Sequence, residues 1–422
     1  MDYDVIVAGA GSAGAATALG CARRGLRVLC VDRRPLDDAG ARWVNAVPAR
    51  HFDLAEVPPP SGAELRAAAG RFHLFVGEQG AKLTVEGHDA LEVDMRRLVQ
   101  RLQTLAAAAG AELRGGVEVH RKEAHALVTS AGRLTARYFV DASGMAGVGL
   151  LGAGPPRRRD VCAAAQQVRA LADRRAAEEF VAHHGAAPGE TLSFAGRAGG
   201  YSVVNVRLEG DEVSLLAGSI PADGHPPGSE LLARFAAEHR WLGPVVFGGA
   251  RAIPLGRPHA RLVSGDTAAV GDAACQVFSA HGSGVGMGMI AAARLAGAIA
   301  GDGGLRQYEA RFHAEWGALL AVYDEFRRLS QRLRPWELEQ LVARGLLDAE
   351  GASAGMRQEL PRLGARRAAR LAVRAASAPG LARPLLATGA RAAVGAALRG
   401  ASPRAPALSP LWSRVATVLD RR

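Results

Sequence analysis

The chain has 422 residues, of which 49% are hydrophobic and 22% are charged, and its formal net charge is +11. This composition is that of a soluble globular protein with a large core, and it excludes a disordered, fibrous or membrane-spanning chain. The four cysteines have neither C-x-x-C spacing nor histidines at metal-ligand spacing, so we expect a reducing compartment, no disulfide and no metal site. We see no secretory signal before the first strand and expect a cytoplasmic protein.

The first forty residues carry a nucleotide-binding pattern. A β-branched run over 4–8 predicts a buried strand, which leads into Gly9-Ala-Gly11-Ser-Ala-Gly14. A helix over 15–24 and a second strand over 27–31 come next, and that strand ends on Asp32. Strand, glycine turn, helix, strand and acid within about thirty residues predict a Rossmann-type fold that binds a dinucleotide.

Each part of this pattern has an expected role. Gly9 permits the tight turn, Gly11 lets the backbone approach a pyrophosphate, and Gly14 lets the helix pack closely on the strand. The backbone N–H groups at Ser12 and Ala13 face the phosphates at the positive end of the helix. The Asp32 carboxylate accepts hydrogen bonds from a ribose diol. This motif alone does not separate FAD from NAD.

A second glycine-rich motif lies far along the chain. A strand over 267–270 leads into Gly271-Asp272-Ala-Ala, and Gly282-Ser283-Gly284-Val285 precedes a small-residue helix over 287–300. A carboxylate at a strand end followed by a helix N-terminus is a second ligand-holding device. An NAD domain does not need one, but a flavin dinucleotide does, because its ribityl chain and ring extend beyond the pyrophosphate. The two motifs together predict non-covalently bound FAD.

The second motif resembles that of the two-domain flavoproteins that include para-hydroxybenzoate hydroxylase, the flavin halogenases and the geranylgeranyl reductases. It looks most like the reductase pattern G-D-A-A-G-x-x-N-P-x-x-G-x-G-I-x-x-A, with which residues 271–286 align without a gap. The resemblance implies that Asp272 bonds the ribityl chain and that the backbone of Gly282 to Val285 faces the pyrimidine end of the flavin. It covers residues 1–330, weakly between 152 and 245, and implies further cofactor contacts by Arg33, Val119 and Gly144.

The sequence departs from this family at several positions. Ser279 replaces a proline, and Met95 stands where the family has an arginine, which leaves Arg96 as the substitute. The loop 41–48 lacks the C-G-G element that many geranylgeranyl reductases carry. The sequence has no W-x-W-x-I-P motif, and neither Lys82 nor Lys122 matches an active-site lysine, which argues against halogenation.

The implied fold class is α/β: a Rossmann-type FAD-binding domain with a parallel sheet, an inserted, mainly antiparallel β-sheet substrate domain, and a helical C-terminal tail. Strands over 161–168, 201–208 and 212–219 are expected in the substrate domain. The expected boundaries are 1–70, 93–156 and 256–330 for the FAD-binding domain, 71–92 and 157–255 for the substrate side, and 331–422 for the tail.

The substrate sheet is expected to lie over the flavin, with a pocket lined by Trp43, Gln166, Asn205, Phe247 and Phe278. His281, in the flavin-facing loop, either protonates the product or modulates the flavin, or it bonds a nearby backbone group. Tyr201 either donates a hydrogen bond to the substrate or satisfies a strand edge. We interpret Cys275 as a buried small residue rather than a redox centre.

The C-terminal region carries the whole excess of charge. Residues 361–422 hold twelve arginines and one acid, Asp420, whereas residues 1–360 are neutral. Arg362, Arg366, Arg370 and Arg374 share one helical stripe, and the prolines and glycines from 379 to 395 are expected to break that stretch into short helical pieces. Such a segment either binds an anionic membrane surface, at the inner face of the membrane, or an acidic carrier protein, or packs on the body. It lacks the interleaved aromatics of a nucleic-acid binder.

Three functions are consistent with the sequence. The leading one is a geranylgeranyl reductase-like FAD oxidoreductase, in which the reduced flavin gives hydride to a C–C double bond of a lipophilic molecule and His281 or a water gives the proton. Because the sequence has no second dinucleotide motif, NAD(P)H binds transiently or a carrier protein supplies the electrons. The alternatives are an FAD monooxygenase of the aromatic hydroxylase type, using NAD(P)H and O₂, and a flavin electron-transfer protein that docks an acidic carrier.

Overall fold

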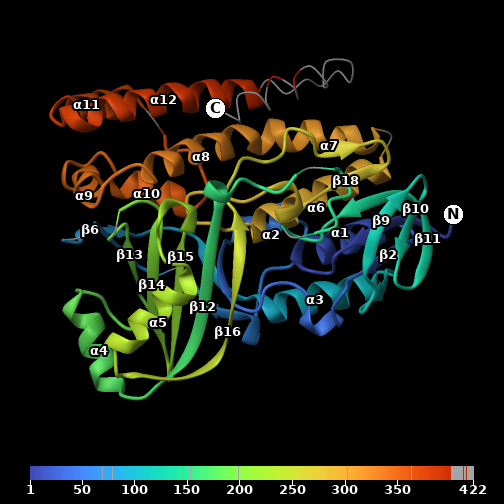
Figure 1. Cartoon of the computed structure of the whole chain (residues 1–422), viewed down its shortest axis with the longest axis horizontal. Helices are drawn as coiled ribbons and strands as arrows, with labels where there is room; N and C mark the ends of the chain where they lie inside the picture. The colour runs from blue at the N-terminus through green and yellow to red at the C-terminus, as the bar shows by residue number, and fades with distance from the viewer. Residues whose placement is uncertain are drawn as a thin grey trace.

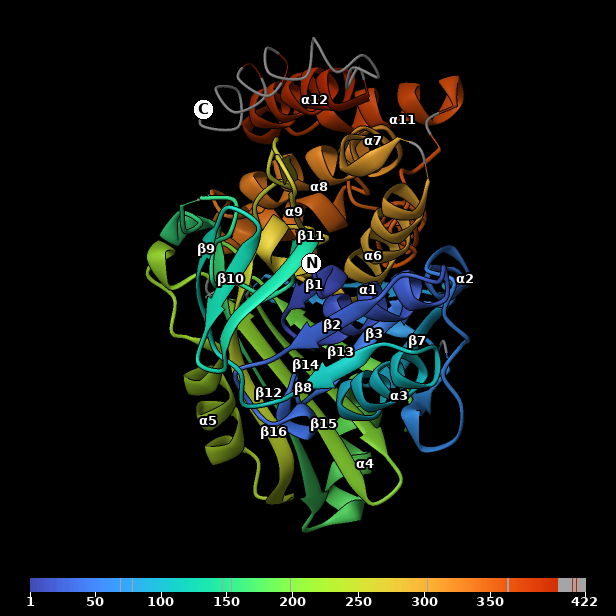
Figure 2. The ribbon, with the colours of Figure 1, turned by 90° about the vertical axis from the view of Figure 1, so that its right-hand side faces the viewer.

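The computed structural model describes residues 1–400 except 69, 78, 146, 153, 198, 302 and 363, together with 412 and 415. In this part of the chain, an eight-stranded sheet with parallel central strands, a seven-stranded, mainly antiparallel sheet with longer strands (the large sheet) and a small third sheet lie beneath a layer of C-terminal helices (Figures 1 and 2). The predicted fold class is confirmed. The predicted strands and helices named above lie within three residues of their expected ends.

The first sheet has the Rossmann-type arrangement. Strands β18, β11, β1, β2 and β8 run parallel in this order, β17 joins the edge, and β9 and β10 extend from β11 as an antiparallel meander. Val5 and Val7 of β1 pack beneath helices α1, α3 and α6, while Ile6 packs against the meander side, so β1 is apolar because both faces are buried. The bounds are β1 Tyr3–Ala8, β2 Val28–Val31, β8 Glu112–Arg114, β9 Val119–Glu123, β10 Ala126–Thr129, β11 Gly132–Asp141, β17 Val263–Ser264, β18 Thr267–Ala269, α1 Ser12–Ala22, α3 Met95–Ala108 and α6 Val285–Ala300.

The second sheet has the order β16-β12-β15-β14-β13-β5-β6 and is antiparallel except where β13 meets β5. Helices α4 and α5 cover one face, packing on residues such as Val206 and Leu215. The other face turns towards β3, α3 and the first glycine turn. The bounds are β5 Phe72–Val76, β6 Ala81–Val85, β12 Val161–Leu171, β13 Thr191–Ala195, β14 Ser202–Glu209, β15 Glu212–Ser219, β16 Leu242–Pro254, α4 Arg174–His183 and α5 Gly228–Glu238. The small third sheet, β3-β7-β4, comprises Val44–Pro48, Ala90–Asp94 and Leu65–Ala67, and α2 spans Arg50–Leu54.

The C-terminal helices are α7 Gly304–Phe312, α8 Ala318–Ser330, α9 Pro335–Ala343, α10 Ala349–Met356, α11 Ala365–Ala376 and α12 Pro379–Gly400. Both views place α12 as an outer layer over α8 (Figures 1 and 2). The expectation that this segment breaks into short pieces is wrong, because α12 continues through Pro384. Its alanine-rich sequence favours helix, and buried residues such as Thr388 and Ala392 hold it in place.

The remainder of the predicted tail, at 401–411, 413–414 and 416–422, lies outside the described residues. Trp412 is buried and donates a hydrogen bond from Nε1 to the Leu398 carbonyl at 2.8 Å. None of the described helices combines the length and the apolar character needed to cross a bilayer.

Candidate cofactor site

The two glycine-rich motifs, far apart in sequence, meet in the structure. A Cβ placed on Gly271 would lie 2.9 Å from the Cβ of Ala13 in the first turn of α1. Helices α1 and α6 begin at Gly11 and Gly284, and neither start has a side-chain cap or an acidic residue in its first turn. Two bare helix N-termini therefore lie together, each with free N–H groups and a partial positive charge that suit an anionic ligand group.

The close packing around the first turn requires glycine at two of its positions. Gly9 has a φ of +107°, and a Cβ there would lie 2.4 Å from the Ala142 carbonyl oxygen. A Cβ on Gly14 would lie 1.8 Å from the Gly9 oxygen, so any larger residue pushes α1 off the turn. Gly144 lies in the loop after β11 and has a φ of +81°.

Asp32 is fixed at the end of β2. Its carboxylate accepts hydrogen bonds from the backbone N–H groups of Ala10 at 2.9 Å and Arg34 at 3.0 Å. Gln103 of α3 donates from Nε2 to the carbonyls of Ala10 and Leu36, both at 3.0 Å, and so joins the glycine turn to the loop after β2. Gln103 belongs to no motif, and sequence reasoning missed it.

Asp272 lies at the start of the second motif and faces the beginning of α6. A Cβ on Gly284 would lie 3.1 Å from its Oδ1. Burial raises the pKa of the Asp272 carboxyl, and only the charge of Arg251 acts in the opposite direction. A buried carboxylate without a compensating hydrogen bond is unfavourable, and hydroxyl donors from a ribityl chain would remove that cost.

The loop between the second motif and α6 is ordered by its own hydrogen bonds. The Phe278 N–H donates to the Ser283 carbonyl at 2.9 Å, and the Ser283 hydroxyl donates to the Ala46 carbonyl of β3 at 3.2 Å. Gly282 has a φ of +74°, and the side chain of Ile253 lies 3.7 Å from where its Cβ would be. Bare helix starts, Asp32 and Asp272 thus form one strip that fits the two phosphates, ribose, ribityl chain and ring of FAD.

Comparisons with known proteins bear on the first of the two motifs. Residues 4–43 match a family described as FAD binding domain. The digeranylgeranylglycerophospholipid reductase of Sulfolobus acidocaldarius is 32% identical over 114 residues, so the match spans about a quarter of each chain: 27% of this one and 25% of the relative. Residues 4–43 are part of an FAD-binding domain.

Solved structures share the fold over most of this chain. A geranylgeranyl bacteriochlorophyll reductase-like protein from Thermoplasma acidophilum has a TM-score of 0.70 at 16% identity, covering 87% of this chain and 95% of its own. An anhydrotetracycline hydroxylase from Streptomyces rimosus has a TM-score of 0.57 at 20% identity, covering 85% and 76%. At such identities the likeness shows the fold alone, and that fold carries both reductases and hydroxylases.

The two catalytic candidates lie in different environments. His281 is exposed beside the ring of Phe278, with ring centroids 4.8 Å apart. Tyr201 is half-buried beside Cys162 and near Arg327, and burial raises its pKa.

Most of the pocket candidates have structural partners. Trp43 and Phe278 are buried in the main core. The Gln166 amide bonds both backbone groups of Val44, donating to its carbonyl at 2.8 Å, so it joins β12 to β3. Asn205 differs, because its Oδ1 is buried and has no hydrogen-bond partner in the described part of the chain.

The other sequence-predicted residues lie around the edges of the FAD-binding domain. Phe247 on β16 lies 3.5 Å beneath the Arg96 guanidinium, which also pairs with Asp94 at 2.7 Å. Arg33 is exposed. Val119 begins β9 and packs with Ile6 on the sheet face opposite α1.

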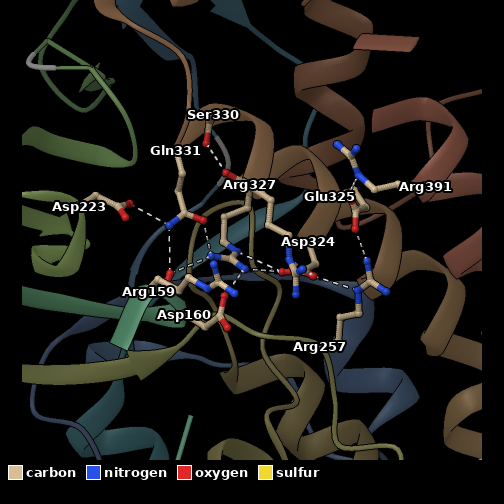
Figure 3. A network of polar contacts seen from close by, with 11 residues as sticks. Arg159, Asp160, Asp223, Arg257, Asp324, Glu325, Arg327, Ser330, Gln331 and Arg391 are labelled. Carbon is tan, nitrogen blue, oxygen red and sulfur yellow. Dashed lines mark hydrogen bonds and ion pairs between the residues drawn. The ribbon is translucent and has the colours of Figure 1, made fainter. Parts of the chain in front are cut away.

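A buried ionic network fixes the substrate sheet to the FAD-binding domain (Figure 3). The fully buried Arg327 of α8 bonds Asp324 at 2.6 Å and Asp160, just before β12, at 2.8 Å. Asp324 also pairs with Arg257, which lies after β16, at 2.9 Å. After β5 and β6, the chain returns to the large sheet at β12 and leaves it at β16, so α8 anchors both of these crossings. Glu325 extends the network to Arg391 of α12 at 2.8 Å.

Proposed function

We propose that the protein is an FAD-dependent reductase of the geranylgeranyl reductase type, which saturates a C–C double bond in a lipophilic small molecule. The observation that carries this proposal is the meeting of two uncapped helix N-termini, with Asp32 and Asp272, beside the face of the large sheet that points away from α4 and α5. The named reductase that is 32% identical to this chain over 114 residues supports the choice among reactions.

Different residues of the chain would hold different parts of the cofactor. Asp32 and the start of α1 hold the nucleotide half, and Asp272 holds the ribityl chain. The bound FAD would supply hydride, with NAD(P)H or a carrier protein as its electron source. The positive end of α6 favours the negative charge that a reduced flavin carries. We assign the proton to His281, which is exposed in the loop before α6, or to a water.

The face of the large sheet that points away from α4 and α5 suits an apolar substrate. Val203 and Leu216 are half-buried on this face, in register with Ala164 and Gln166 of β12. Asn205, whose Oδ1 has no hydrogen-bond partner among the described residues, lies in the same row as Leu216 and offers one polar contact. Apolar side chains with a few polar groups are the usual lining of a small-molecule site.

The test is product analysis. The FAD-loaded protein is reduced without oxygen and mixed with a geranylgeranyl lipid, and mass spectrometry should find two hydrogens added per reduced double bond. Incorporation of labelled oxygen from O₂ in the presence of NAD(P)H would instead establish the hydroxylase. Rapid electron exchange with an acidic carrier, with no small molecule converted, would establish the electron-transfer protein.

We also propose that the outer face of α11 and α12 docks on an anionic bilayer. Four tail arginines bind the body: Arg367, Arg374, Arg391 and Arg399. The outer face instead exposes Val373, Leu386 and Val394 at 70%, 72% and 57%. Arg366, Arg370 and Arg383 are exposed on the same two helices, and residues 361–400 contain no acid. Apolar side chains beside uncompensated arginines suit an anionic lipid surface.

Liposome sedimentation tests this docking. Leu386→Asp with Val394→Asp should abolish binding to anionic vesicles, whereas Val246→Asp, at a residue 53% exposed on β16, should not. Equal binding by neutral vesicles, or binding only to an acidic protein, would contradict the proposal.

A further inference from the structure

Two arginines from different domains converge above the first glycine turn. Arg34, in the loop after β2, donates to the Gly40 carbonyl at 3.4 Å, and Arg251 of β16 donates to the same oxygen. Gly40 itself packs on the turn, with its Cα 3.3 Å from the position of a Cβ on Gly11. Both guanidinium groups therefore reach the place where the FAD-binding domain is expected to hold phosphate.

The strand β16 points Arg251 at this place. Phe247, Gly249, Arg251 and Ile253 pair with alternate residues of β12 and share one sheet face. On that face Phe247 lies against Arg96, and Ile253 lies against the Gly282 loop. Arg251, between them, thus spans the gap from the large sheet to the glycine turn.

Acidic groups surround these two arginines, but none of those described holds either of them at two points. The Arg251 side chain is exposed, and Asp272, Asp32 and Asp38 attract its charge while Arg34 repels it. Arg34 Nε lies 3.9 Å from Asp32 Oδ1, but that carboxylate already accepts two backbone N–H groups, and Asp272 faces α6. Within the described residues, neither guanidinium therefore has the bidentate anionic partner that arginine prefers.

The position at the start of α3 where related flavoproteins have an arginine supplies no positive charge here. Met95, where related flavoproteins have an arginine, is buried with 1% of its surface exposed. The neighbouring Arg96 is committed to Asp94 and to the ring of Phe247. Arg96 therefore does not supply a free guanidinium to the glycine turn.

We infer that Arg251 and Arg34 bind the diphosphate of the dinucleotide opposite the N-terminus of α1, so that the substrate sheet itself helps to hold the cofactor. This inference rests on the proposed binding of FAD. Arg251 is thereby a cofactor-binding residue contributed by a strand that the sequence motifs do not include.

Binding of three ligands to the full-length protein, stripped of flavin and refilled, tests the inference. Arg251→Gln should weaken FAD and ADP by ten- to a hundredfold and leave riboflavin, which has no diphosphate, unchanged. The FAD and ADP affinities of Arg251→Lys should lie between those of the wild type and Arg251→Gln, because lysine keeps the positive charge but not the two-pronged guanidinium. Arg175→Gln is the control, since that side chain is 89% exposed on α4.

The outcomes separate the inference from the proposed function. Unchanged FAD affinity in Arg251→Gln, or an equal loss of FAD and riboflavin, would overturn the diphosphate contact while leaving the flavoprotein intact. A wild-type chain that binds ADP but neither FAD nor riboflavin would overturn the flavin function and leave the diphosphate contact standing.

Discussion

Gly288, one turn into α6, packs directly against Ala13 in the first turn of α1: a Cβ at Gly288 would lie 3.2 Å from the Ala13 Cβ. This contact holds the two helix N-termini together. Gly288→Val should push the helices apart and weaken FAD binding at least tenfold, with a stability loss of about 1–3 kcal/mol from overpacking. Gly297→Val lies in the same helix, where the nearest atom to an added Cβ is the Arg24 Nη2 at 3.9 Å, so it carries the same change in helix propensity and should retain FAD. Flavin fluorescence quenching measures both, and equal affinities would contradict the predicted contact.

Asp272→Asn should affect protein stability and FAD binding in opposite directions. Burial raises the pKa of this carboxyl, so the folded apoprotein holds the proton more tightly than the unfolded chain, and the associated stability is lost as pH rises through that window. The amide has no charge to bury, so the apo variant should melt at the wild-type temperature or above at pH 7. Its FAD affinity should nevertheless fall by roughly ten- to a hundredfold, because a hydrogen bond to a charged group contributes about 1.5–3 kcal/mol. A variant that retains full FAD affinity would remove Asp272 from the site.

The ionic network of Figure 3 predicts a large loss on removal of a single member. Asp324 is fully buried and pairs with Arg257, Arg327 and Arg328. Asp324→Asn should destabilise the protein by about 3–5 kcal/mol, because it leaves buried guanidinium groups uncompensated. Asp211→Asn, at a carboxylate 94% exposed and paired with Arg174, should cost less than about 1 kcal/mol. Denaturant midpoints compare them, and similar losses would show that the network is not buried in solution.

The two glycine turns could be predicted from the sequence because each is a local pattern in which every residue has its own steric role. Gly9, Gly14 and Asp32 occupy the expected places in the turn and at the strand end. The contacts that join the domains have no such local signature. Gln166 bonds Val44 across 122 positions, and Arg251 bonds Gly40 across 211. Each of these side chains has an ordinary sequence neighbourhood, and only the packing of the large sheet reveals its partner.

His51 makes the fold sensitive to acid. Its ring is fully buried against Gly286, and neither ring nitrogen has a hydrogen-bond partner within the described residues. Burial, together with the charges of Arg50 and His281, lowers its pKa to about 3. Between these pH values the His51 imidazole is protonated in the unfolded chain but not in the folded one. Stability is therefore lost as pH falls from about 6.5 towards 3.

His51→Leu should remove this dependence. The stability difference between the variant and the wild type should grow by about 2 kcal/mol in the variant's favour from pH 7 to pH 5. The control is His120→Leu, at an exposed position in β9, which should behave as the wild type does. Denaturant unfolding at the two pH values measures the difference, and parallel curves for all three proteins would mean that His51 has a proton partner in solution.

Cys275 replaces the glycine of the reductase pattern and keeps a backbone angle that favours glycine, with a φ of +53°. It is 4% exposed, and burial raises its pKa to about 12, so the thiol is an unreactive core group. A left-handed conformation costs an ordinary residue about 1–2 kcal/mol. Cys275→Gly should therefore be more stable than Cys275→Ala by about 1 kcal/mol, although glycine gains more freedom on unfolding. At Cys162, within strand β12, the order should reverse, because extended backbone gives glycine no advantage. Finding alanine superior at both positions would show that residue 275 is not left-handed, and the loop that brings Asp272 to the start of α6 would then have a different shape.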